Sequence, residues 1–281
     1  MIPILRALRP RQWIKSVLLL AAPVGASIEP SLENLLLVTK GVIAFSLAAS
    51  TGYVVNDFKD RYHDLNHKEK STRPFASGEL GGAHAFFLAA TLMLFSFLLS
   101  FQVGLNFTLC TFSYLALTFC YTLWLKKVPV LEMVVIAGGF LMRALAGALA
   151  VNVSVSKYFL IVTGFGSLFL ISSKRLAELK NYSDNQTRVV ITKYSQSFLV
   201  TVNGISITVT LVMFNEWAFE VARNSFWGQL SMVPVLIALL RYLWKSELTQ
   251  TEAPDAAIFE DKLVPVCGII TLALLCLAIY T

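Results

Sequence analysis

Four oxygen-bearing side chains recur within one short stretch of the chain, at Asn56, Asp57, Asp60 and Asp64. Three of them are spaced i, i+4 and i+8, so a helix would place them along one face, with Asp57 at the edge of that stripe. Like charges at this spacing destabilise a helix, and a cation held among the oxygens relieves the repulsion. Carboxylate and amide oxygens suit Mg²⁺, which commonly bridges a few carboxylates to substrate phosphates. The pattern therefore predicts a magnesium site formed by these four residues, with the three aspartates as catalytic residues.

A solvated charged loop is the alternative interpretation of the same stretch. In such a loop, Asp60 and Asp64 would pair with neighbouring Lys and Arg side chains. Exposed pairs of this kind contribute little stability, and they give no reason for acidic residues to cluster at the end of an apolar segment.

Basic residues in the same stretch and in a second cluster are candidates for holding phosphate groups. An Arg guanidinium can bind phosphate oxygens through two parallel hydrogen bonds, and Lys supplies a point charge. These candidate substrate-binding residues, with a Glu and a Tyr that accompany the second cluster, are Lys15, Lys70, Arg73, Lys174, Arg175, Glu178, Arg188 and Tyr194. For Lys15, Lys174 and Arg175, basic flanks that only orient a membrane span are an equally good explanation.

Two further ionisable residues, Glu132 and Arg143, fall inside an apolar segment. A charged group is costly within a bilayer, so both are candidates for substrate binding. They are separated by about three helical turns, which places them near one face but out of contact. A structural pairing with other helices is the alternative.

The elements that must position these residues are membrane-spanning helices. The chain has 281 residues, of which 56% are hydrophobic and only 14% are charged, against roughly 25% charged in soluble domains. Long apolar runs predict an all-α, polytopic membrane protein with a bundle of about nine transmembrane helices, and residues 1–281 are expected to form a single domain. The predicted spans are residues 15–27, 35–56, 82–103, 106–125, 130–151, 158–173, 198–219, 231–244 and 264–280.

The distribution of Lys and Arg predicts the orientation. Of the 23 basic residues, 19 fall in the N-terminal segment and in alternate loops, which places the N-terminus and the Asp-rich stretch at the cytoplasmic face of the inner (plasma) membrane. The net charge of +6 is therefore a topology signal, and we expect no nucleic-acid partner.

The pattern Asn56-Asp57-x-x-Asp60-x-x-x-Asp64, at the end of the second predicted span, resembles the first aspartate-rich motif of the UbiA superfamily of membrane prenyltransferases. Within that superfamily, the chain resembles the branch of decaprenyl-phosphate phosphoribosyltransferases over nearly its whole length. The segments that carry this resemblance include Arg9-Pro10-x-Gln12-Trp13-x-Lys15, Lys70-x-x-Arg73-Pro74, Arg143-Ala144-x-Ala146-Gly147 and Lys174-Arg175-x-Ala177-Glu178.

The resemblance implies a fold of helices, usually nine, and a Mg²⁺-dependent transfer of 5-phosphoribose from phosphoribosyl pyrophosphate to a polyprenyl phosphate. One departure from most of the superfamily favours this branch: a second aspartate-rich motif is replaced here by Lys174, Arg175 and Glu178. Membrane lipids are further expected partners, and an oligomer is compatible with these features. An aromatic prenyltransferase that uses a prenyl diphosphate, and a non-enzymatic transporter, are the alternative functions.

Overall fold

The structure is a computed structural model that describes residues 2–25, 31–66, 70–180, 190–248 and 261–281. Within these ranges all regular elements are α-helices or short 3₁₀ helices, which confirms the predicted all-α fold class. The chain divides into two compact units. Unit 1 consists mainly of Met1–Val135 and Gly139–Ser154, and unit 2 mainly of Val155–Ser183 and Thr187–Thr281. The expectation of one domain over the whole chain stays a prediction.

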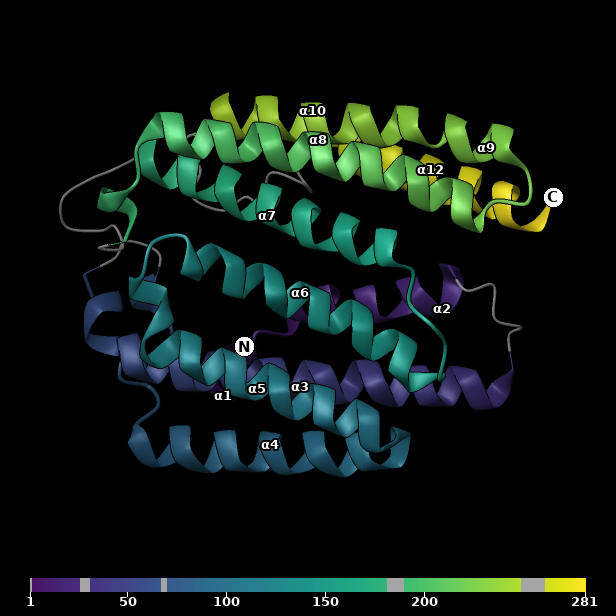
Figure 1. The fold of residues 1–281 in the computed structure, drawn as a ribbon. Coiled ribbons are helices and arrows are strands. Elements are labelled where there is room, and N and C mark those ends of the chain that lie inside the picture. The colour runs from purple at the N-terminus through teal and green to yellow at the C-terminus, as the bar shows by residue number, and fades with distance from the viewer. Residues whose placement is uncertain (1, 26–30, 67–69, 181–189, 249–260) are drawn as a thin grey trace. The chain divides into compact units, whose positions relative to one another are not determined.

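Unit 1 is organised around one long helix, α3. Its helices are α1 (Pro3–Leu8), η1 (Pro10–Leu20), α2 (Ala21–Gly25), α3 (Leu32–Asp64), η2 (Lys70–Thr72), α4 (Gly82–Val103), α5 (Leu105–Leu123), η3 (Leu125–Lys127) and α6 (Leu131–Ala150). Helix α3 begins at Leu32, where the Ser31 hydroxyl accepts a hydrogen bond from the Asn34 amide. Its 33 residues give a length of about 50 Å. Helices α1, η1, α4 and α5 all pack against it (Figure 1).

The core of unit 1 joins α3, α5, α6 and η1. The ring of Phe45 lies edge-on to Phe107 and tilted against Tyr114. A close approach occurs at Gly147, where an added Cβ would lie 1.9 Å from the carbonyl oxygen of Leu19. Only glycine fits at this point, so the approach fixes how η1 and α6 pack.

Unit 2 is built on the pairing of α7 with α8. Its helices are α7 (Lys157–Lys180), η4 (Ile191–Lys193), α8 (Gln196–Val221), α9 (Ser225–Leu230), α10 (Met232–Leu248) and α12 (Leu263–Tyr280). Ser172 and Ser173 on α7 both donate hydrogen bonds to the side-chain oxygen of Asn203 on α8. Phe214 and Ala218 on α8 pack with Leu275 on α12. Both polar and apolar contacts therefore hold this unit together.

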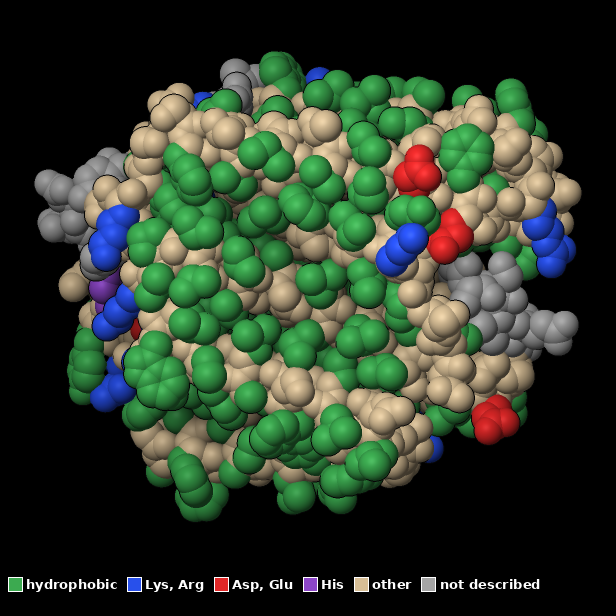
Figure 2. Space-filling view, viewed as in Figure 1, with side chains coloured by type: hydrophobic (Ala, Val, Ile, Leu, Met, Phe, Trp, Pro, Cys, Tyr) green, Lys and Arg blue, Asp and Glu red, His purple; other side chains and the backbone are tan. Residues whose placement is uncertain are grey.

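The helices fit a multi-pass membrane protein. Among the described residues, seven helical segments are long and apolar enough to span a membrane: Leu32–Asp64, Gly82–Val103, Leu131–Ala150, Lys157–Lys180, Gln196–Val221, Ser225–Ser246 and Leu263–Tyr280. Hydrophobic side chains cover the middle of the helices on the face shown in Figure 2, while charged side chains lie mostly near helix ends. These segments correspond to seven of the nine predicted spans. Predicted span 106–125 is found as the 19-residue α5, which is not among these seven segments, and predicted span 15–27 corresponds to the short η1 and α2. The number nine is thus approximate.

Candidate functional site

The Asp-rich stretch lies on the last turns of α3. The helix continues to Asp64, eight residues beyond the predicted end of the span, so Asn56 to Asp64 are helical and not a loop. Asp57 and Asp64 are only 3% and 4% exposed. The loop of the alternative interpretation is therefore wrong, and so is solvation of Asp57 and Asp64, but the pairing that it predicted for Asp60 and Asp64 with basic side chains is found. Burial of a carboxylate is costly unless it is paired and hydrogen-bonded, so its partners decide what the site can do.

Asp57 is held by two arginines from different segments. Arg9, the residue after α1, donates to both carboxylate oxygens, through Nε at 3.0 Å and through Nη2 at 2.6 and 2.8 Å. Nη1 of Arg73 donates a longer bond of 3.3 Å to the same carboxylate. The same Nη1 donates at 2.7 Å to Asp64. Arg73 thus bridges two aspartates that lie seven residues apart on α3.

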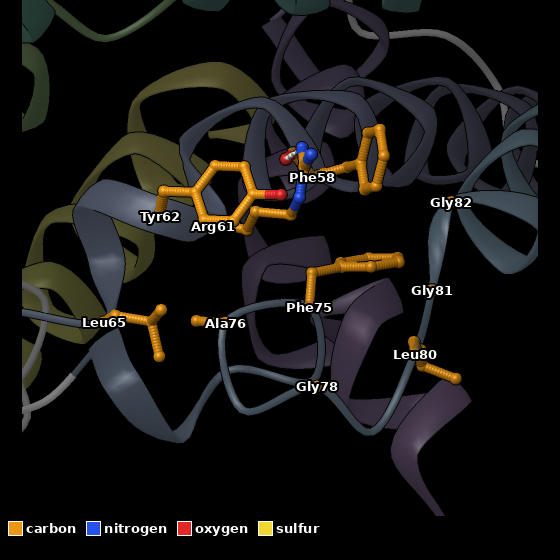
Figure 3. Close-up of a pocket in the computed structure, with 10 residues that line it drawn as sticks. All are labelled: Phe58, Arg61, Tyr62, Leu65, Phe75, Ala76, Gly78, Leu80, Gly81 and Gly82. Carbon is orange, nitrogen blue, oxygen red and sulfur yellow. Dashed lines mark hydrogen bonds between the residues drawn. The ribbon is translucent and has the colours of Figure 1, made fainter.

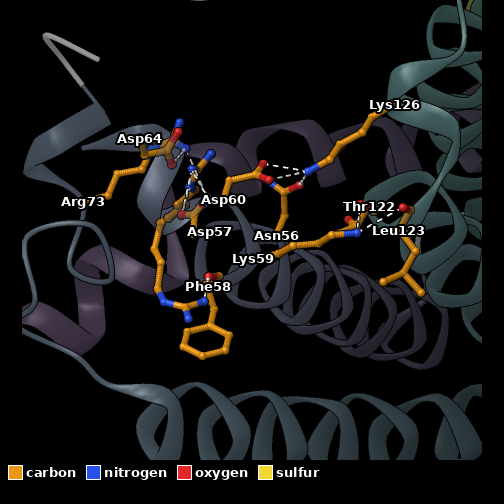
Figure 4. Close-up of polar contacts among 12 residues, drawn as sticks. Asn56, Asp57, Phe58, Lys59, Asp60, Asp64, Arg73, Thr122, Leu123 and Lys126 are labelled. Carbon is orange, nitrogen blue, oxygen red and sulfur yellow. Dashed lines mark hydrogen bonds and ion pairs between the residues drawn. The ribbon is translucent and has the colours of Figure 1, made fainter. Parts of the chain in front are cut away.

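Asn56 and Asp60 share a different cation. The ammonium group of Lys126, on η3, lies 3.2 Å from the Asn56 oxygen and 2.6 and 2.7 Å from the two Asp60 oxygens. Asp60 is about 30% exposed, so this part of the site is open to solvent. Nearby, Lys59 donates to the carbonyl oxygens of Thr122 and Leu123, which fixes the end of α5 against α3 (Figure 4).

The three aspartates and the neighbouring basic groups form two adjoining clusters. Among the described residues, no three His, Cys, Asp or Glu side chains converge enough to enclose a metal ion. The donor set nevertheless fits a hard divalent cation, because it consists of carboxylate and amide oxygens. In the structure, the oxygens of Asn56 and Asp60 bind one positively charged group, the Lys126 ammonium. The assignment of the four residues as metal ligands stays a prediction.

Sequence reasoning missed two residues of this site. In the sequence, Arg9 is only part of the motif that carries the family resemblance, and Lys126 is only one of the 19 basic residues that predict the orientation. Arg9 adopts a left-handed backbone conformation, with φ 52° and ψ 57°, which is rare for a residue other than glycine. Such an outlier often accompanies a functional constraint. Here the unusual backbone conformation occurs at Arg9, whose side chain pairs with Asp57. The proline that follows Arg9 is the only sequence feature that marks this position.

The remaining predicted residues of unit 1 lie in varied surroundings. Lys15 and Lys70 are half-buried on η1 and η2, and the Lys15 ammonium lies 6.0 Å from the ring centre of Phe140. Glu132 is fully buried in the first turn of α6. Arg143 is buried, and its guanidinium donates a hydrogen bond of 2.7 Å to the Tyr114 hydroxyl.

Arg143 therefore has the surroundings of a packed structural cation. It also donates to the backbone oxygen of Gly139 and lies over the Tyr114 ring at 4.7 Å. Both contacts stay within unit 1, which agrees with the structural alternative for this residue. A role in substrate binding stays a prediction.

Three of the predicted residues of unit 2, Lys174, Arg175 and Glu178, lie near the end of α7. Arg175 is 2% exposed and forms an ion pair with Glu178 at 2.6 Å, one turn further along the helix. Lys174 is half-buried beside them. Tyr194 is buried, and its ring stacks on that of Phe198. Arg188 lies outside the described residues.

Three comparisons with known proteins agree on one family. The model of the UbiA prenyltransferase family matches residues 16–263. A decaprenyl-phosphate phosphoribosyltransferase of Corynebacterium glutamicum is 33% identical over 98% of this chain and 86% of its own length. A protein of the same name from Mycobacterium tuberculosis H37Rv is 34% identical over 96% of this chain and 92% of its own length. A solved structure of a UbiA homolog from Archaeoglobus fulgidus, described as bound to GPP and Mg²⁺, covers 99% of this chain and 100% of its own with a TM-score of 0.75 at 17% identity.

Proposed function

Because this chain belongs to the UbiA prenyltransferase family, we propose that it transfers 5-phosphoribose from phosphoribosyl pyrophosphate to a polyprenyl phosphate of the decaprenyl type. Pyrophosphate is the leaving group. The curated relatives named for this reaction match nearly the whole chain, which supports the choice of substrates. The reaction takes place at the cytoplasmic face of the inner membrane, the side to which the Lys and Arg distribution assigns the Asp-rich end of α3.

The observation that carries this proposal is the pairing of acidic groups on α3 with basic groups from neighbouring segments. Asp57 and Asp64 meet the guanidinium groups of Arg9 and Arg73, and Asp60 meets the Lys126 ammonium. A donor that carries both a diphosphate and a separate 5-phosphate needs oxygen ligands for a cation and basic groups for further phosphate oxygens. A prenyl diphosphate carries only the first of these groups, and the second aspartate-rich motif that suits it is replaced by Lys174, Arg175 and Glu178.

A divalent cation, Mg²⁺ in our proposal, would be held by Asn56, Asp57, Asp60 and Asp64. When bound, it supplies Lewis-acid stabilisation of the negative charge on the leaving pyrophosphate. Structures of Archaeoglobus fulgidus UbiA homologs are described with Mg²⁺ and with Cd²⁺, which supports a divalent cation in this fold.

The protein side chains would bind and orient the two substrates. An oxygen of the acceptor phosphate forms a bond to the anomeric carbon as the bond from that carbon to pyrophosphate breaks on the opposite side. The acceptor is a phosphate monoester with about 1.5 to 2 negative charges near neutral pH, so it needs no general base. Basic side chains hold the phosphate oxygens and counter the developing charge; those we assign to this role are Lys15, Lys70, Arg73, Lys174, Arg175 and Arg188.

The test is a lipid-extract assay on the purified full chain. Labelled phosphoribosyl pyrophosphate is supplied with polyprenyl phosphates of several lengths, with and without Mg²⁺, and a parallel reaction contains a prenyl diphosphate and an aromatic acid. We expect labelled lipid only in the first reaction and only with Mg²⁺. Product only in the second reaction would show an aromatic prenyltransferase. If neither reaction gave product and the protein moved a solute across the membrane of reconstituted vesicles, it would be a transporter.

Three variants test the carboxylates directly. Asp57→Ala, Asp60→Ala and Asp64→Ala should each abolish transfer, because each removes oxygen ligands from the proposed cation site. Glu33→Ala, an acidic position in the first turn of α3 at its opposite end, is the matched control and should keep full activity. Circular dichroism and gel filtration check that each variant folds. Retained Mg²⁺-dependent transfer in all three would reject the metal assignment.

A further inference from the structure

Two cavities of unit 1 meet on a face of α3 that carries none of the four predicted metal ligands. The first, of about 410 Å³, lies beside the turn before α4 and is lined by Phe58, Arg61, Tyr62, Phe75, Leu80 and Gly82, among others (Figure 3). The second, of about 330 Å³, runs along α4 and is lined by Val55, Phe58, Gly82, Ala89, Ala90 and Phe119, among others. Both volumes lie within the roughly 300–1,000 Å³ typical of ligand clefts. Because Phe58 and Gly82 line both, the two cavities adjoin.

The first cavity has a cationic wall. The guanidinium of Arg61 lies 4.1 Å from the ring centre of Phe58 and 4.2 Å from that of Tyr62. Its Nη1 donates a hydrogen bond of 2.7 Å to the carbonyl oxygen of Phe58 (Figure 3). No carboxylate in the part of the chain that the structure describes pairs with Arg61. A guanidinium has five N–H donors, so most of them are available to an anion, and the exposed Tyr62 hydroxyl lies on the next residue.

The second cavity is apolar and faces the outside of the bundle. On α4, Ala85, Ala89 and Ala90 leave room between the larger side chains of Phe86 and Met93. Helix α4 is among the least buried of the candidate spans, with 17% of its most apolar window inside the structure. In a membrane this surface therefore contacts hydrocarbon, and a chain that fits the groove is an alkyl chain.

The spacing on α3 separates this surface from the Asp-rich stripe. Phe58, Arg61, Tyr62 and Leu65 are spaced i, i+3, i+4 and i+7, which is one helical face. Asp57, Asp60 and Asp64 lie on another. A ligand that contacts Arg61 is therefore not held by the carboxylates that serve the proposed reaction.

We propose that the joined cavities bind an anionic phospholipid of the surrounding membrane. Its phosphate contacts the Arg61 guanidinium and the Tyr62 hydroxyl, and one acyl chain lies in the groove along α4. The singly charged phosphodiester of such a lipid matches one guanidinium. Phe75 and Leu80 of the cavity belong to the segment that follows Arg73, so the bound lipid also supports the segment whose arginine bridges Asp57 and Asp64.

Native mass spectrometry of the full chain in detergent tests this proposal without any activity measurement. The protein is titrated with phosphatidylglycerol and, separately, with phosphatidylcholine of identical acyl chains. We expect tighter binding of phosphatidylglycerol, and a loss of at least about tenfold in its affinity for Arg61→Gln, because one charged hydrogen-bonding group is removed. Arg11→Gln, an exposed arginine that lines neither cavity, is the matched control and should bind as the wild type.

A second pair of variants tests the groove. Ala90→Trp fills the cavity and should weaken the binding of both lipids, whereas Thr91→Trp places the same side chain on the exposed neighbouring position, which lines neither cavity. Equal binding of the two lipids by the wild type, or unchanged phosphatidylglycerol binding by Arg61→Gln, would overturn the proposal. Displacement of phosphatidylglycerol by equimolar polyprenyl phosphate would also overturn it, since the site would then hold the acceptor. If Ala90→Trp fails to fold, the two arginine variants still decide the question.

Discussion

Arg73 is shared by two carboxylates at unequal distances, and replacing it with glutamine should therefore affect the two pairs unequally. Its Nη1 lies 2.7 Å from Asp64 and 3.3 Å from Asp57. Asp57 keeps the two-nitrogen contact with Arg9 when Arg73 is removed, whereas Asp64 has no second basic partner within the described segments. A double-mutant cycle separates the two pairwise energies, because it subtracts the cost of each single substitution.

The size of each coupling energy follows from these contacts. A hydrogen bond to a charged group contributes about 1.5 to 3 kcal/mol, and the Arg73 side chain is about 25% exposed, so solvent screening lowers that value. We expect a coupling of about 1 to 2 kcal/mol between Arg73 and Asp64, and less than about 1 kcal/mol between Arg73 and Asp57. The Arg9–Asp57 pair, with three contacts of 2.6 to 3.0 Å, should be at least as strongly coupled as Arg73–Asp64.

The assay is the free energy of unfolding in mixed micelles, titrated with sodium dodecyl sulfate and followed by far-ultraviolet circular dichroism. The cycles combine Arg73→Gln with Asp64→Asn and, separately, with Asp57→Asn. An Arg73–Asp57 coupling as large as the Arg73–Asp64 coupling would refute the reasoning. It would mean that the Arg9 guanidinium does not reduce the contribution of Arg73 to the stabilisation of the Asp57 carboxylate.

Three further predictions concern packing, pH and the cation site. Gly147→Ala should destabilise the protein by about 3 kcal/mol, because the added methyl group clashes with the Leu19 carbonyl. In the control Gly139→Ala the nearest atom would be 3.6 Å away, so the stability should change little. Equal melting temperatures of the two variants would contradict this prediction. The hydrogen bond from Arg241 lowers the pKa of Asp261, so its stabilising effect is present above the unfolded pKa of about 3.9 and is lost as the pH falls through the lower folded pKa. Asp261→Asn should therefore be less stable near pH 7 and lose less stability below about pH 4, and superimposable pH profiles of wild type and variant would rule this out. Lys126→Met removes the ammonium group that is bound to the Asp60 oxygens. It should tighten Mg²⁺ binding about fivefold, equivalent to about 1 kcal/mol, as measured by calorimetry. Weaker Mg²⁺ binding would contradict this, since it would show that Lys126 favours binding of the cation.

The helices were predictable because their signal is local. The apolar run at residues 82–103 gave α4 with the same bounds that the structure has, Gly82–Val103. The stripe from Asn56 to Asp64 was predicted from helical spacing, and α3 does carry these residues. The first predicted span, at residues 15–27, was less accurate, since an apolar run does not reveal that residues 10–20 form a 3₁₀ helix.

The partners of the carboxylates were beyond sequence reasoning. Arg9 lies 48 residues from Asp57, and Lys126 lies 66 residues from Asp60. Which basic residue reaches which aspartate depends on how α1, α3 and η3 pack, and no local pattern encodes that packing. The same holds for Arg143, whose hydroxyl partner Tyr114 is 29 residues earlier on α5.

The length of α3 ties the site to the thickness of the bilayer. At about 50 Å it exceeds a hydrocarbon layer of about 30 Å by several turns, and its last turns carry the carboxylates. A rigid helix that is longer than the layer it crosses adjusts to thicker or thinner membranes by tilting. We therefore expect the height of Asp57, Asp60 and Asp64 above the lipid surface to change with lipid chain length, and with it the distance that the phosphate of the proposed acceptor must travel to reach them.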